Sequence, residues 1–147
     1  MRRVAISACL VGKPCRYDGK DNYAQALLEM LEGDELIPFC PEDAAFGSPR
    51  PTMDLIETRC GIEAVCNGSG VLRSEAIRAY ARNFFDQHGA IDLFIGKDRS
   101  PSCGVCSARL YDTQKNLLSS SAAGLMAQEA IDRNIAAVDA EKFEGKV

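Results

Sequence analysis

Four short apolar segments recur along the chain, each bounded by polar or turn-forming residues. They cover residues 3–7 (RVAIS), 35–39 (ELIPF), 91–96 (IDLFIG) and 135–138 (IAAV). Segments of this length and composition are typical of buried β-strands. Pro38 has no backbone N–H to donate to a neighbouring strand, so it predicts an edge position for the second segment.

Helical periodicity separates these strands. Residues 74–88 show it most clearly, with apolar positions recurring three and four residues apart. A second helix is predicted between Asn22, as its N-cap, and Gly33, which ends it. A third helix is predicted over residues 121–133, before the last strand.

Two stretches follow neither pattern. Residues 41–70 contain GSPRP and CNGSG and predict a long irregular segment, which is uncommon in a compact domain unless it covers a site. Residues 108–112 (ARLYD) predict a small excursion or hairpin arm. Because the chain shows no repeat, low-complexity tract or linker, we expect a single domain over residues 1–147.

The order of these elements predicts an α/β fold. Alternating strands and helices favour one open, mostly parallel sheet with helices on both faces. Right-handed crossovers make strand order 2-1-3-4 the most economical, as in Rossmann-like folds of flavodoxin-like order. Ligands in such folds bind beyond the carboxyl ends of the strands, here beside the switch point between the first and third strands.

Composition narrows the function classes. The chain is 46% hydrophobic and 26% charged, with a net charge of −4, which is typical of a globular domain. The absence of a basic run or an interleaved aromatic stripe argues against a nucleic acid polymer as partner. No apolar segment has the length of a membrane span, and MRRVAISACLVG is interpreted as a first strand, not a signal peptide. We therefore expect a cytoplasmic protein, and its oligomeric state stays open.

Seven cysteines are the unusual feature of the composition. Their odd number, in a chain of ordinary domain size, argues against a disulfide framework. In a reducing compartment such cysteines bind metal, take part in chemistry or fill the core as small hydrophobic residues. Their positions relative to the predicted strands decide between these roles.

Three cysteines follow strands that the predicted order makes neighbours. Cys9 lies two residues after the first strand, Cys40 directly follows the second, and Cys103 lies in the loop after the third. Adjacent strands are about 4.8 Å apart, so the three thiols should lie within roughly 5–10 Å of each other. Three convergent thiolates without an obligatory fourth ligand suit an iron–sulfur cluster that keeps one iron open for substrate.

Another class of function stays open. A structural zinc site requires four ligands, commonly in paired short spacings, and Cys103 to Cys106 is the only C-x-x-C in the chain. A thioredoxin-like motif should begin a helix, whereas the SARLYD segment after Cys106 looks extended. The alternative to an enzyme is a zinc-binding protein without turnover, or a redox or sulfur sensor that uses Cys103 and Cys106.

Longer motifs resemble those of a known family. They are SACLVGKPCRYDG (7–19), PFCPE (38–42), SPRP (48–51) and GKDRSPSCG (96–104). Their order and spacing are similar to the signatures of the 2-thiouracil desulfidases, a small bacterial family formerly known only as a domain of unknown function. The likeness runs from residue 3 to about residue 138.

This resemblance implies a Rossmann-like domain with a 4Fe–4S cluster bound by Cys9, Cys40 and Cys103. It implies that the unligated iron captures the sulfur of a small thiolated pyrimidine and that water replaces this sulfur without net redox change. Glu42 and Ser100 would then transfer protons near the cluster.

Other residues of these motifs are further candidates. Those expected to bind substrate are Arg16, Tyr17, Asp18, Arg50, Lys97 and Ser102, and Cys15 and Cys106 are additional candidates for contact with the metal. Cys60 and Cys66 would cover the site, supply a fourth ligand or form a disulfide. Ala44 occupies a position where the family often has a second acidic residue, which removes one candidate for proton transfer.

Overall fold

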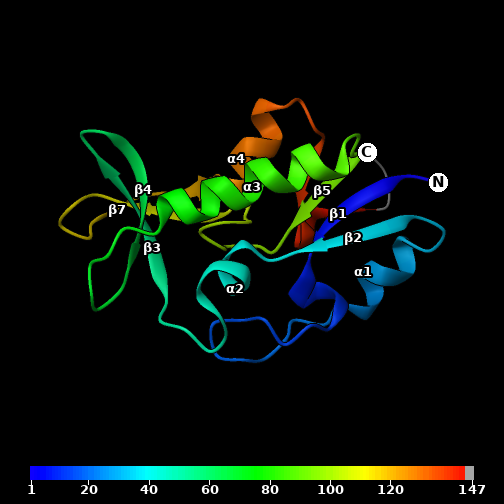
Figure 1. The fold of residues 1–147 in the computed structure, drawn as a ribbon, viewed down its shortest axis with the longest axis horizontal. Helices are drawn as coiled ribbons and strands as arrows, with labels where there is room; N and C mark the ends of the chain where they lie inside the picture. The colour runs from blue at the N-terminus through cyan, green and yellow to red at the C-terminus, as the bar shows by residue number, and fades with distance from the viewer. Residues whose placement is uncertain (145–147) are drawn as a thin grey trace.

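Residues 1–144, which the computed structural model describes, form two four-stranded β-sheets and four α-helices (Figure 1). The first sheet contains β1 (Arg3–Ser7), β2 (Glu35–Phe39), β5 (Leu93–Gly96) and β8 (Ala137–Asp139). Its strands are parallel and lie in the order β2-β1-β5-β8. They overlap the four apolar segments of the sequence, and β2, which contains Pro38, lies at the sheet edge. The predicted α/β class is confirmed.

Helices cover both faces of this sheet. On one face, Val4 and Ile6 of β1 pack near α1 (Gln25–Met30). On the other face lie α3 (Ser74–His88) and α4 (Leu125–Asp132). Burial of both faces explains why the central strands β1 and β5 are continuous apolar runs without alternation. The predicted range of α3 is confirmed.

Two predicted helix starts are wrong. Ala24, not Asn22, is the N-cap of α1, and no side chain caps this helix. The predicted end at Gly33 is also wrong, because α1 ends at Met30 with Leu31 as its C-cap. The last helix begins at Leu125 because Ser121 belongs to a strand, β7 (Leu117–Ala122).

The second sheet is absent from the sequence-based prediction. It contains β3 (Met53–Thr58), β4 (Gly61–Cys66), β6 (Ala108–Tyr111) and β7, in the order β4-β3-β6-β7. The predicted hairpin arm at residues 108–112 is confirmed, because β6 pairs antiparallel with β7. The expectations of one sheet and of an irregular segment over residues 41–70 are wrong, since that segment forms α2 (Pro41–Phe46) and the β3–β4 hairpin.

Helix α3 joins the two sheets and runs across both of them in Figure 1. Near its start, Ile77 packs with Leu55 and Ala108 of the second sheet. Near its end, Phe84 and Phe85 pack into the core of the first sheet. The second sheet therefore buries its apolar face against the same helix. Within residues 1–144, no helix combines the length and the apolar character that a membrane span requires.

The carboxyl ends of β1, β2 and β5 meet at one edge of the first sheet. From this edge, β1 continues into the 3₁₀ helix η1 (Ala8–Val11), and β2 continues into α2. Strand β5 continues into the loop of residues 97–107, and a second 3₁₀ helix, η2 (Ala140–Lys142), follows β8. These connections surround the site described next.

Candidate metal centre

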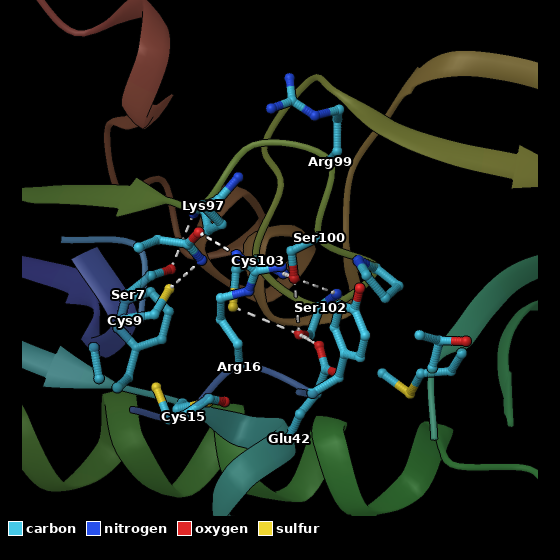
Figure 2. Close-up of a pocket in the computed structure, with 18 of the residues that line it drawn as sticks. Ser7, Cys9, Cys15, Arg16, Glu42, Lys97, Arg99, Ser100, Ser102 and Cys103 are labelled. Carbon is cyan, nitrogen blue, oxygen red and sulfur yellow. Dashed lines mark hydrogen bonds between the residues drawn. The ribbon is translucent and has the colours of Figure 1, made fainter. Parts of the chain in front are cut away.

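A cavity of about 510 Å³ lies at this edge of the first sheet (Figure 2). Four cysteines, Cys9, Cys15, Cys40 and Cys103, line it. Three of them follow β1, β2 and β5, so the parallel topology brings residues far apart in sequence to one wall. Its volume lies within the range of about 300–1,000 Å³ that is usual for small-molecule sites.

Cys9 lies in η1 and is buried. Its carbonyl oxygen accepts hydrogen bonds from the backbone N–H groups of Gly12 and Asn22. Gly12 ends the helix with a φ of 99°, a left-handed conformation that glycine adopts without steric cost. The Asn22 side chain also reaches Cys9, with 3.3 Å between Nδ2 and Sγ.

Cys40 is the N-cap of α2. Its sulfur accepts a hydrogen bond from the backbone N–H of Asp43 at 3.4 Å, and its own N–H donates to the Tyr80 hydroxyl of α3 at 3.2 Å. Pro41 occupies the first turn, where a helix needs no N–H donor. The local sequence therefore directs the thiol toward the start of the helix and the cavity.

Cys103 is held by its own loop. The Ser100 hydroxyl accepts hydrogen bonds from the backbone N–H groups of Cys103 at 3.0 Å and Ser102 at 3.3 Å. A Cβ on Gly96 would lie 1.8 Å from the Cys103 carbonyl oxygen, and one on Gly124 would lie 2.5 Å from the Ser102 carbonyl carbon. Only glycine fits these two positions. The close packing of β5 and of the start of α4 against the loop therefore fixes where the Cys103 backbone lies.

A buried carboxylate holds the other side of this loop. Asp139, at the end of β8, accepts hydrogen bonds from the N–H groups of Val105 and Cys106 at 2.7 and 2.9 Å, and from the Ser107 hydroxyl at 2.8 Å. Cys106 is exposed, and its thiol lies 3.6 Å from the Ser121 carbonyl oxygen. Cys106 does not line the cavity, which separates it from Cys103.

Burial raises the pKa of three cavity thiols, those of Cys15, Cys40 and Cys103. Burial is the main cause that raises the pKa values of Cys103 and Cys40. The pKa of Cys15 is raised to about 12, first by burial and then by the neighbouring Cys40 thiolate. In the absence of a metal these thiols are neutral near pH 7, so a metal that binds them must displace protons.

The donor set fits an iron–sulfur cluster. Within residues 1–144, no three His, Cys, Asp or Glu side chains converge closely enough to bind a single metal ion. The thiols are instead distributed around a cavity, and a cluster takes its cysteine ligands on separate irons. Soft thiolate ligands also match iron–sulfur chemistry.

A carboxylate and two serines lie beside the thiols. The Ser102 hydroxyl, which is fully buried, donates a 2.6 Å hydrogen bond to Oε2 of Glu42. It also lies 3.2 Å from the Ser100 hydroxyl and 3.5 Å from the Cys103 sulfur. Figure 2 shows this chain of polar groups leading from Glu42 toward Cys103. Such a chain can carry a proton between Glu42 and the part of the cavity wall beside Cys103.

Arg50 is the buried cation nearest to this chain. Its Nε lies 3.5 Å from Oε1 of Glu42, and its side chain is 7% exposed. Its Nη1 donates to the Gly47 carbonyl oxygen and to the Ser48 hydroxyl, whereas Nε has no hydrogen-bond partner among the described residues. Its charge is therefore placed beside Glu42 by contacts at the other end of the guanidinium.

Most of the other predicted substrate residues line the cavity. These are Arg16, Tyr17, Lys97 and, from the polar chain, Ser102. Asp18 does not line it, and its predicted place in the pocket wall is wrong. Its carboxylate instead lies 3.3 Å from Arg16 Nη2 and accepts a hydrogen bond from the Lys20 N–H, which completes the local turn.

Neither Cys60 nor Cys66 lines the cavity, although Cys66 pairs with the cavity residue Met53 and lines a small neighbouring pocket that Glu42 and Arg50 share. Cys60 is exposed at the β3–β4 turn, and Cys66 is buried at the far end of β4. A six-residue strand separates them by roughly 16–20 Å, too far for a disulfide. The expected disulfide between them is therefore wrong, and neither supplies a thiol to the cavity wall.

Sequence reasoning missed several cavity residues. They are Ser7, Ala8, Asn22, Phe39, Thr52, Met53, Asp98, Arg99 and Pro101. The helix-capping pattern of the sequence predicts Asn22 as an N-cap and gives no indication that it lines the cavity. One feature of the sequence could have indicated this position. Asn22 lies shortly after the CRYDG turn, and a chain that reverses there can bring Asn22 back beside Cys9.

Comparison with known proteins adds independent information. A protein-family model described as 2-thiouracil desulfurase matches residues 4–142. A solved structure described as a [4Fe-4S]-dependent thiouracil desulfidase, TudS (DUF523Vcz), is similar with a TM-score of 0.77 and 27% sequence identity. The similarity covers 97% of this chain and 93% of that chain. No curated protein sequence gives a significant match.

Proposed function

This chain belongs to the 2-thiouracil desulfurase family, and we propose that it removes sulfur from a thiolated uracil or a related thio-nucleobase without net redox change. We propose a 4Fe–4S cluster as cofactor, bound by Cys9, Cys40 and Cys103. The observation that supports this most directly is the convergence of three strand-end thiols on a cavity that also contains Glu42.

When bound, such a cluster supplies an iron without a protein ligand, which acts as a Lewis acid toward the sulfur of the substrate. The three cysteines come from three separate segments, and each is fixed by hydrogen bonds to its backbone or sulfur. This anchoring would let Cys9, Cys40 and Cys103 hold a cluster at this edge of the sheet and leave one iron without a protein ligand.

The overall reaction replaces a C=S group by C=O, with one water consumed and one hydrogen sulfide released. The two protons of that water must leave its oxygen and reach the departing sulfur. Glu42 is placed to accept a proton and return it, since it lines the cavity and is hydrogen-bonded to Ser102. Ser102 and Ser100 extend this path toward Cys103.

The cavity also offers contacts for a polar heterocycle. Tyr17 is partly exposed and offers an aromatic face, with its ring centroid 5.6 Å from the Arg16 guanidinium carbon. Lys97 lines the cavity while its Nζ donates to the Asp98 carbonyl oxygen at 3.2 Å. We propose that Tyr17, Lys97 and Arg50 position the substrate ring and its carbonyl oxygen. These contacts suit a small molecule of the size of a pyrimidine.

The alternative of a sensor based on Cys103 and Cys106 has less support. Cys103 is buried in the cavity wall, whereas Cys106 is exposed and directed toward Ser121. The two thiols therefore lie in different environments, one buried and one exposed, which does not favour their acting as a pair.

Anaerobic reconstitution tests the proposed function. We expect about four irons and four inorganic sulfides per chain, and sulfide release from 2-thiouracil, 4-thiouracil or thiouridine nucleotides, with the oxygen-containing pyrimidine as product. Cys9→Ser is the control that should lose both cluster and activity. Stoichiometric zinc without iron uptake, or a loaded cluster that releases no sulfide from any of these compounds, would contradict the proposal.

A further inference from the structure

Asn22 is hydrogen-bonded to Cys9 through both its backbone and its side chain. Its N–H donates to the Cys9 carbonyl oxygen at 2.9 Å, and its Nδ2 donates to the Cys9 sulfur at 3.3 Å. The residue lies in the segment between η1 and α1 and lines the same cavity as the thiols. It therefore contacts a proposed cluster ligand directly.

Arg16 determines which end of the Asn22 amide faces the sulfur. Its Nη1 lies 3.1 Å from Oδ1 of Asn22. A guanidinium group can only donate hydrogen bonds, so the amide oxygen must face Arg16 and the amide NH₂ must face Cys9. Asp18 in turn lies 3.3 Å from Arg16 Nη2. The four residues form a connected chain, Asp18–Arg16–Asn22–Cys9.

This donor is suited to a charged sulfur. A neutral thiol is only a weak hydrogen-bond acceptor, whereas hydrogen bonds to an ionised group are stronger. Hydrogen bonds to the ligand sulfurs of iron–sulfur clusters also help to set their reduction potential. The Asn22 amide thus has the chemistry of a group that stabilises a ligating thiolate.

A purely structural role for the Asn22 side chain does not explain its contact with the Cys9 sulfur. Asn22 does not cap α1, since Ala24 is the N-cap of that helix. The backbone bond from Asn22 to Cys9 already joins the two segments without the side chain. Among the described residues, the side-chain amide of Asn22 hydrogen-bonds Arg16 and the Cys9 sulfur, so its orientation directs a donor at that sulfur.

We propose that Asn22 is a positioning residue that hydrogen-bonds the Cys9 thiolate, slows loss of the bound cluster and raises its reduction potential. Arg16 holds the amide in this orientation, and Asp18 supports Arg16. This inference rests on the cluster of the proposed function. It gives Arg16 and Asp18 a supporting role toward Cys9, and for Arg16 this role is additional to its place in the cavity wall.

The test compares anaerobically reconstituted wild type with Asn22→Ala and Asn22→Leu. Both variants keep the backbone N–H, and leucine also keeps most of the side-chain volume without a donor. Asn116→Ala is the matched control, because the Asn116 Nδ2 donates to Asp112 in the turn between β6 and β7. Iron and sulfide content, the reduction potential from an EPR-monitored titration, and the rate of iron loss to a chelator are measured for each protein.

We expect both Asn22 variants to load the cluster, to show a more negative potential and to lose iron about 10-fold faster, while Asn116→Ala matches wild type. Wild-type values for Asn22→Leu would show that packing alone matters and would overturn the inference. Unchanged potentials in both variants would do the same and leave the proposed function intact. A wild-type chain that takes up no iron would overturn both.

Discussion

Ser102 donates a 2.6 Å hydrogen bond to Glu42, sixty residues earlier in the chain. The bond joins the loop after β5 to the first turn of α2, which follows β2. Because β1 lies between those two strands, the bond crosses the switch point of the sheet beside the cavity thiols. Among the residues expected to transfer protons, Glu42 is therefore oriented by Ser102 directly, and Ser100 acts one hydroxyl further away.

Glu42→Ala should keep the cluster and lose activity. The substitution removes the carboxylate that accepts from Ser102, and general acid–base groups typically contribute about 10²–10⁴-fold to the rate. Iron content and sulfide release measure the two effects separately. Glu75→Ala is the matched control, since Glu75 lies in the first turn of α3, pairs with Arg82 and does not line the cavity. Loss of both cluster and activity in Glu42→Ala would make Glu42 a structural residue.

The two cysteines of the C-x-x-C should respond differently to serine substitution. Cys103→Ser removes a buried thiol of the cavity wall, so we expect loss of most of the bound iron. Cys106→Ser changes an exposed thiol outside the cavity and should retain iron and activity. Iron and sulfide analysis after anaerobic reconstitution shows which of the two cysteines is required for cluster binding. The reverse pattern would show that the ligand assignment is wrong.

Replacing the glycines around the Cys103 loop with alanine should lower the stability of the chain by different amounts. The added Cβ would meet backbone atoms at 1.8 Å for Gly96, 2.5 Å for Gly124 and 3.0 Å for Gly104. Overpacking typically costs about 1–3 kcal/mol, so Gly96→Ala should be the most destabilising and Gly104→Ala the least. Urea unfolding of the metal-free proteins measures stability, and iron uptake reports the displacement of Cys103. Equal stability of all three variants would contradict this account.

The first sheet could be predicted because its central strands, β1 and β5, are buried on both faces. Val4, Ala5 and Ile6 are inaccessible to solvent, and such strands are visible in sequence as short apolar runs. The carboxyl ends of parallel strands share one edge, so the positions of the cysteines just after them indicated a common site.

The second sheet could not be recognised in the same way. Strand β3 reads MDLIET and β4 reads GIEAVC, with charged residues among the apolar ones, and most of β7 is exposed. Their apolar faces become clear only when α3 is placed against them.

Side-chain partners within the site were also hidden from sequence. The bond between Asn22 and Cys9 depends on how the CRYDG segment turns back, and that between Glu42 and Ser102 depends on the packing of two loops. Asp18 was misplaced because its pairing with Arg16 is a property of the local turn.

The stability of the metal-free chain should fall as the pH rises above about 9. Burial raises the pKa values of Cys15, Cys40 and Cys103 above their ordinary value of 9.0 in the folded chain. Below pH 9 these thiols are protonated in both states, and their contribution to stability is fully present. Above it, the unfolded chain releases protons first and is favoured, and for Cys15 the contribution is lost progressively toward about pH 12.

Urea unfolding at pH 8 and pH 10, under anaerobic reducing conditions, measures this effect. Cys15→Ala should lose less stability than wild type over this interval, because one of the buried thiols is gone. Cys60→Ala is the control, since Cys60 is exposed and should leave the wild-type pH dependence unchanged. If wild type and Cys15→Ala lose the same stability between the two pH values, burial does not hold the Cys15 thiol in its neutral form.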